Sequence, residues 1–386
     1  MNSARALRIT HRHSNCILSG TLVIIGAIFC PSAPAQNPVP RATFDGECTA
    51  MAYAPDGRLA YSIRHVFDIR TLQVQRDDIW VLESDGRRRK IVNGERLVQG
   101  PAAFSYTITR LRWSPDGTRL TAELHTSQLV RGAGKQDSNL LLLINQDGKE
   151  IKIIAGESVI RGALDGTWLG DNNTVAYLAQ SAKSDIMYSV GVAHIDRGRG
   201  GVLFEDRAFA AVAWNAKLGT AAAIDRGPGM SGQPTLVVLD LLKEEHRPLT
   251  ILDAYIGGLS ISPSGSKFAY FTDTNTLEVR DVAHPEQPIR VPAEYGTVAW
   301  APDESRLLLK SGIEREEGNL MWVSLSGPPK STELASADHG PGSNLMPSTP
   351  ELFAGQSFRD FALSPDGHSL AVILFDKRTL LVYDLK

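Results

Sequence analysis

The residues of this chain best suited to metal chemistry are a few histidines that lie far apart in the sequence. His65 and His125 each begin a long polar segment, and His339 or Asp68 would have to join them. A protein metal site needs three or four side chains that converge on one point. Two histidines without such a set are more typical of ordinary surface residues. We therefore predict no metal site and no cofactor.

Nucleophilic catalysis finds little support in the residue pattern. The serine-hydrolase pattern Gly-x-Ser-x-Gly is approached at 229–233 and 258–262, but both segments fail at the last position. Cys48 has no neighbouring base or cation to activate its thiol, so we expect a buried apolar residue there. We predict no catalytic residue, which favours a protein that is not an enzyme.

Composition describes a large globular protein without a strong charge. The 386 residues are 42% hydrophobic and 22% charged, with a formal net charge of −3. Such a chain can bury a sizeable core. It has no basic excess that would attract nucleic acid, so we expect no nucleic-acid partner.

The first 35 residues resemble a secretory signal peptide. Three arginines without an acidic residue precede an apolar run at 17–29, which is too short to span a bilayer comfortably. Small residues at 33–35 then predict cleavage before Gln36. We expect two regions: a signal peptide at 1–35 and a single domain at 36–386. The mature protein would be periplasmic or secreted, with no membrane span, and the alternative is a signal retained as an anchor.

A short turn motif recurs through the rest of the chain. In five clear copies an aromatic or apolar residue is followed by Ser or Ala, then Pro, then Asp or Ser, then Gly or Glu. These copies lie at 53–57, 113–117, 261–265, 300–304 and 363–367. Two degenerate copies lie between them, at 168–172 and 214–218. Proline presets φ, aspartate binds its own backbone, and glycine accepts a positive φ, which together make a tight turn. An apolar strand precedes and follows each turn.

Four short strands per period of about 50 residues are typical of a β-propeller blade. The fold class we predict is all-β: a seven-bladed β-propeller, with six blades as the alternative. The last repeat supplies three strands before the chain ends. We predict that the segment 39–45 adds the fourth strand and protects the exposed sheet edge.

The turn, followed by an apolar strand, a strand such as Ile79-Trp-Val-Leu82 and then Asp85-Gly86, resembles the propeller repeats of TolB and of the prolyl-oligopeptidase family's N-terminal domain. The resemblance covers nearly all of 41–386 and implies a β-propeller. It would imply a serine hydrolase only with an additional α/β-hydrolase domain, which we do not expect. Oligogalacturonate lyases hold a metal with histidines on a similar scaffold, so a metal-assisted polysaccharide lyase or a lactonase-like enzyme stays open as an alternative.

Four long insertions are expected as loops on one face of the propeller: 64–78, 93–106, 125–138 and 335–357. Long loops on one sector of a rigid scaffold are a plausible binding surface. Their aromatic and arginine residues suit a protein contact, although the loops could also merely cover the face. The candidate binding residues are His65, Phe67, Asp68, Arg70, Phe104, Tyr106, His125, Arg131, His339, Phe353 and Arg359.

Taken together, these features predict an exported, non-enzymatic propeller that acts as a protein-binding or scaffold module in the bacterial cell envelope. We expect a monomer with an envelope protein as partner. The alternatives are the propeller enzymes named above and a carbohydrate- or peptide-binding protein.

Overall fold

The computed structural model describes most of the chain after the predicted signal. The chain divides into two units, Met1–Ala35 and Gln36–Lys386, and all described residues belong to the second. They are 39–69, 72–97, 103–130, 134–156, 162–180, 188–204, 207, 209–227, 232–312, 316–325 and 356–385. Among them, no helix is both long enough and apolar enough to span a membrane.

The described residues form β-strands and two short 3₁₀ helices, η1 (Gly94–Arg96) and η2 (Ala216–Leu218). The strands fall into consecutive groups of antiparallel neighbours. The first two groups are β2 (Glu47–Tyr53), β3 (Leu59–Ile69), β4 (Leu72–Leu82) and β5 (Arg88–Val92), then β6 (Ala103–Trp113), β7 (Arg119–Val130), β8 (Gly134–Asn145) and β9 (Ile151–Ala155). The next two are β10 (Ala163–Trp168), β11 (Thr174–Gln180), β12 (Tyr188–His194) and β13 (Arg199–Leu203), then β14 (Phe209–Asn215), β15 (Thr220–Asp225), β16 (Thr235–Asp240) and β17 (Glu245–Ile251).

The later groups repeat the same order. They are β18 (Gly257–Ile261), β19 (Lys267–Asp273), β20 (Thr276–Asp281) and β21 (Ile289–Pro292), then β22 (Gly296–Trp300), β23 (Arg306–Ser311) and β24 (Leu320–Ser324), then β25 (Phe358–Leu363), β26 (Ser369–Leu374) and β27 (Leu380–Asp384). A single residue pair, Tyr188 and Phe209, joins the group β10–β13 to the group β14–β17 in one eight-stranded sheet.

The N-terminal strand β1 (Ala42–Phe44) pairs with β27 at the end of the chain. Phe44 lies opposite Leu380, and the Arg41 amide donates to the Val382 carbonyl at 2.7 Å. The prediction that the segment 39–45 completes the last group of strands is confirmed. This pairing covers an edge of β27 that would otherwise expose unpaired peptide groups.

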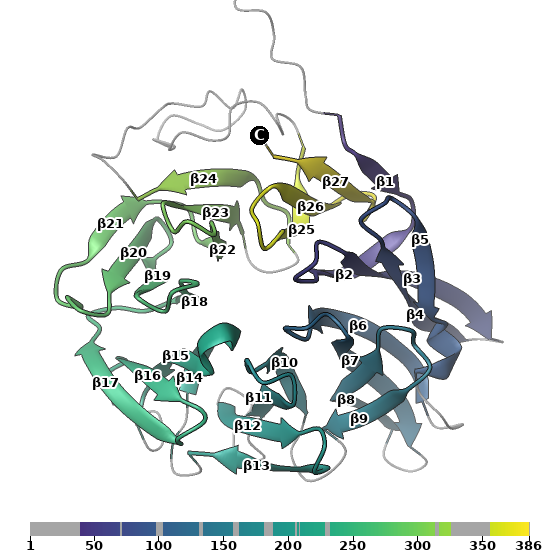
Figure 1. The fold of residues 1–386 in the computed structure, drawn as a ribbon, viewed down its shortest axis with the longest axis horizontal. Helices are drawn as coiled ribbons and strands as arrows, with labels where there is room; N and C mark the ends of the chain where they lie inside the picture. Colours follow the sequence, from purple (N-terminus) through teal and green to yellow (C-terminus); the bar gives the residue numbers. More distant parts are fainter. Residues whose placement is uncertain are drawn as a thin grey trace, which may run out of the picture. The chain divides into compact units, whose positions relative to one another are not determined.

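Hydrophobic clusters fill the spaces between neighbouring groups, and the groups follow one another round a ring with their first strands innermost (Figure 1). The cluster that joins the two chain ends contains Phe44, Cys48, Tyr61 and Val382. Cys48 is fully buried there, and burial raises the pKa of its thiol to about 12. The expected burial of Cys48 among apolar residues is confirmed. This arrangement is a β-propeller.

The recurring motif forms the turn between the first and second strand of a group. Gly57, Gly117 and Gly367 have φ values of +84°, +69° and +73°. Asn172 and Glu304 occupy the same place in their motifs with φ values of +55° and +57°. Since non-glycine residues seldom adopt this conformation, backbone geometry favours glycine at this place of the motif without requiring it in every copy.

The tryptophans of the motif column pack between groups, as the repeat predicts for core residues. Trp113 and Trp168 are 7% and 1% exposed. Their indole N–H groups donate to carbonyls of the preceding innermost strand, Trp113 to Ala52 at 3.2 Å and Trp168 to Arg112 at 3.3 Å. Trp214 differs, because its indole N–H donates to the carboxylate of Asp165.

The expectation of loops at 64–78 and 125–138 is wrong. Strands β3 and β4 remain paired to Ile69 and Leu72, and β7 and β8 remain paired to Val130 and Gly134. The insertions are long hairpins whose main chains satisfy each other's hydrogen bonds. Of the other two insertions, 93–97 holds η1, 103–106 begins β6, and 326–355 lies outside the described residues.

Candidate functional site

The first long hairpin projects beyond the strands that flank it. Strand β2 accompanies β3 only as far as Arg64, and β5 accompanies β4 only as far as Ile79. We name residues 65–69 and 72–76 the projecting hairpin. Its two strands therefore pair mainly with each other. Connections between strands alternate between the two ends of a group, so this hairpin lies on the face opposite the Pro-Asp-Gly turns. We name that face the hairpin face.

Four successive residues of the projecting hairpin, 65–68, are exposed. Val66 is 45% exposed and Phe67 is 44% exposed. Side chains alternate between the two faces of a strand, so exposure of four in a row means that both faces of this strand are open to solvent. An aromatic residue on such a projection is typical of a surface that contacts a partner.

Two adjacent aspartates hold the base of the projecting hairpin. Asp77 is fully buried and accepts hydrogen bonds from Thr49 Oγ1 at 2.9 Å and from the Ile108 amide at 2.7 Å. Burial raises the pKa of Asp77, although the Arg64 guanidinium opposes this. Asp78 accepts from the Gly94 amide at 2.8 Å and pairs with Lys90. These contacts tie the hairpin to β6 and to η1.

The candidate binding residues lie in different surroundings. His65 Nε2 is 3.1 Å from Asp78 Oδ2, and with Phe67 it lines a hollow of about 210 Å³. Asp68 is exposed and does not line this hollow. His125 lines a separate, larger cleft. The structure therefore places the two histidines in different hollows. Among the described residues, no group of three or more His, Cys, Asp or Glu side chains could hold a metal ion.

Tyr106 was expected on the binding surface, but it is 4% exposed and belongs to the core between the first two groups. Phe104 and Arg359 lie in β6 and β25. Four candidates fall outside the described residues: Arg70, Arg131, His339 and Phe353.

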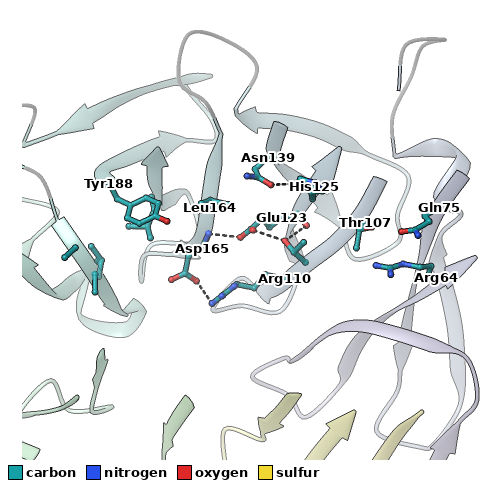
Figure 2. Close-up of a pocket in the computed structure, with 15 residues that line it drawn as sticks. Arg64, Gln75, Thr107, Arg110, Glu123, His125, Asn139, Leu164, Asp165 and Tyr188 are labelled. Atoms are coloured by element: carbon teal, nitrogen blue, oxygen red, sulfur yellow. Dashed lines mark hydrogen bonds and ion pairs between the residues drawn. The ribbon is translucent and has the colours of Figure 1, made fainter. Parts of the chain in front are cut away.

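The cleft that His125 lines has a volume of about 710 Å³ and lies on the side of the ring formed by the first four groups (Figure 2). Sequence reasoning selected only His125 of its lining. Polar residues recur every second position along two of its strands, Thr107 and Thr109 in β6 and Glu123 and His125 in β7. That alternation is the sequence signal that could have indicated the cleft.

Asp165 is the charged centre of the cleft wall. It lies at an irregularity of β10, with φ at +48°. Its carboxylate accepts from Arg110 and Arg112, each at 2.8 Å, and from the indole N–H of Trp214 at 2.9 Å. Burial alone would raise the pKa of Asp165, but the two guanidiniums hold it below its usual value. The carboxylate is therefore a fixed, compensated anion.

Other polar groups of the cleft hold one another in place (Figure 2). Glu123 is 8% exposed, accepts from Thr109 Oγ1 at 2.8 Å and accepts from the Asp165 amide at 2.7 Å. His125 Nδ1 is 3.0 Å from Asn139 Oδ1, the distance of a hydrogen bond in which the imidazole donates. A wall fixed in this way needs little rearrangement to bind a ligand.

A second hollow, of about 780 Å³, opens on the face of the Pro-Asp-Gly turns. Pro55, Pro115 and Pro365 line it, together with Trp113. It shares Thr109 and Arg110 with the cleft described above. Residues beside Asp165 thus separate a hollow on one face from a cleft on the other.

Comparisons with known proteins support the fold and do not name a family. No protein-family model matches the chain, and no curated protein matches it. A solved structure described as "Crystal Structure of Mitotic Checkpoint Complex" contains a chain with a TM-score of 0.54 and 12% identity, over 96% of this chain and all of that one. At this identity the likeness shows the fold alone. The protein is thus a β-propeller, and the resemblance to TolB repeats stays a prediction.

Proposed function

We propose that this protein is an exported β-propeller of the bacterial cell envelope that binds a protein partner through the projecting hairpin. The observation that carries the proposal is the projecting hairpin, whose exposed Val66 and Phe67 stand on a firmly anchored base. Burial of a Val or Phe side chain contributes about 1.5–3 kcal/mol. Two such side chains on a rigid support suit the centre of a protein interface.

We further propose that the propeller has seven blades and works as a monomer. The two halves of the eight-stranded sheet are joined by the single pair Tyr188–Phe209, so we count them as two groups. The strands β2–β24 then make six groups of three or four strands, and β25–β27 together with β1 make the seventh. The proposal of export rests on the sequence of residues 1–35. The proposal of a TolB-like family rests on the turn motif.

A pair of matched variants tests the protein contact. Val66→Ser and Phe67→Ser together remove the exposed apolar surface of the projecting hairpin. Phe375→Ser is the control, because Phe375 is 36% exposed in the equivalent turn of the last group of strands. Each variant is compared with the unaltered protein by quantitative co-purification from envelope extract.

We expect the hairpin variant to lose its co-purifying protein at least about tenfold, as about 1.4 kcal/mol of interface energy would require. The Phe375 variant should keep it. Equal recovery with all three proteins would contradict the proposal, provided that each variant remains folded by circular dichroism.

A further inference from the structure

A second kind of binding is suggested by the cleft beside Asp165, whose lining does not include the exposed Val66 and Phe67 of the projecting hairpin. Its volume of about 710 Å³ lies within the range of about 300–1,000 Å³ that is common for small-molecule sites. We propose that this cleft binds a short, uncharged oligosaccharide. This site is additional to the protein contact proposed above.

The residue types on one side of the cleft suit sugar hydroxyls. Gln75, Arg110, Glu123, His125 and Asn139 all have planar polar groups, and they come from β4, β6, β7 and β8. A hydroxyl group both donates and accepts hydrogen bonds. Ligands with many hydroxyls therefore match a wall that offers amide, carboxylate, guanidinium and imidazole groups within one cleft.

The charges of the cleft favour an uncharged ligand. Arg110 pairs with Asp165 at 2.8 Å. Arg64 pairs with Glu47 at 2.8 Å and with Asp77 at 3.3 Å. Because both arginines are already compensated by carboxylates, the cleft has no excess of positive charge. A phosphate or a uronate would have to displace these carboxylates, and burial of an uncompensated charge is costly.

The opposite side of the cleft has an aromatic and apolar character. Tyr188 lies across the cleft from Arg64 and Gln75 (Figure 2). Leu164, Leu178 and Val212 also contribute to the lining. The C–H faces of a sugar ring are apolar and pack against such groups, while its hydroxyls reach the polar side. This combination provides orientation as well as affinity.

A peptide is the competing ligand, and the strands that line the cleft differ in how well they suit it. Extended peptides commonly bind by adding a strand to an open sheet edge. Among the lining strands, β7 pairs with β6 and β8 on its two edges, and β11 pairs with β10 and β12. Strands β6 and β10 stand at the ends of their sheets, so a peptide must be compared directly with the sugars.

Titration calorimetry tests the inference with defined probes. The probes are the neutral trisaccharides maltotriose, cellotriose, xylotriose, mannotriose and tri-N-acetylchitotriose, with trigalacturonate and blocked trialanine as the charged and peptidic comparisons. The cleft variant carries Gln75→Ala and Asn139→Ala. The control variant carries Asn145→Ala and Gln146→Ala, which removes the same side-chain types at the C-terminal end of β8 and just after it.

We expect at least one neutral trisaccharide to bind the unaltered protein and the control variant, with binding to the cleft variant weakened about tenfold or more. Val66→Ser with Phe67→Ser should leave this binding unchanged, which separates the cleft from the protein contact. The proposal is overturned if no neutral trisaccharide binds at up to about 10 mM. It is equally overturned if trigalacturonate or trialanine binds more tightly, or if the control and cleft variants lose affinity alike.

Discussion

Replacement of Asp165 by asparagine should destabilise the protein by about 2–3 kcal/mol at pH 7. The carboxylate receives two guanidinium hydrogen bonds and one indole hydrogen bond. Hydrogen bonds to charged groups contribute about 1.5–3 kcal/mol each. Arg110 and Arg112 are 32% and 38% exposed, so water screens part of that energy. Asparagine keeps one acceptor oxygen and tolerates the positive φ of this position, which leaves the lost charge as the main change.

The pH dependence of this loss follows from the lowered pKa of Asp165. A carboxyl group whose pKa is lower in the folded state stabilises the fold above its unfolded pKa and loses that effect as the pH falls through the folded value. The difference between Asp165→Asn and the unaltered protein should therefore be complete from about pH 5 to pH 8. It should shrink below the ordinary aspartate value of 3.8.

Urea denaturation at several pH values measures both quantities. Asp376→Asn is the control, because Asp376 is exposed and its loss should change the free energy of unfolding by less than about 0.5 kcal/mol. A change equally small for Asp165→Asn at pH 7 would refute the role of Asp165 as the charge that compensates both arginines. A difference that grows as the pH falls below 4 would refute the direction of the pKa shift.

Three further predictions concern the fold of the propeller. Glu278→Gln should destabilise the protein by about 2–4 kcal/mol, because the buried Glu278 carboxylate accepts hydrogen bonds from Tyr270, Arg280 and Arg290 at 2.6, 2.9 and 2.8 Å. Urea denaturation measures this loss. A change in the free energy of unfolding below about 0.5 kcal/mol would contradict the prediction. Gly57→Ala should cost about 1–2 kcal/mol through its φ of +84° alone, since no atom lies within 4 Å of the added methyl. Gly201→Ala, equally open but without a positive φ, should cost less, and equal losses in thermal denaturation would reject the backbone explanation. Deletion of residues 39–45 should lower the denaturation midpoint and promote aggregation through the opened edge of β27; size-exclusion chromatography with light scattering would count against this if the shortened chain stayed monomeric and equally stable.

The repeated turn made the fold accessible from the sequence, because each part of the motif has a local cause. Proline, aspartate and glycine act within five residues, and the tryptophan before them enters a core that repeats in every copy. The N-terminal closing strand could also be predicted, since the last repeat was one strand short. These features depend on neighbours in sequence or on simple counting.

The two long hairpins and the cleft could not be predicted in the same way. The polar residues at 64–78 suggested loops. A hairpin that projects into solvent does not need apolar residues at alternate positions, because its two strands pair with each other and have no core to cover. Asp165 meets Arg110 across 55 positions and Trp214 across 49. Its place beside a degenerate copy of the motif gave no local sign of this. Such pairings arise only when consecutive groups pack side by side.

Site-specific photocross-linking tests the central proposal, protein binding through the projecting hairpin, most directly. A benzophenone amino acid replaces Phe67 in one full-length protein and Phe375 in a second, and both are irradiated in envelope extract. We predict one discrete cross-linked protein from position 67, competed away by an excess of the unlabelled protein, and none from position 375. The absence of a competable product at position 67, or the same products from both positions, would contradict the account.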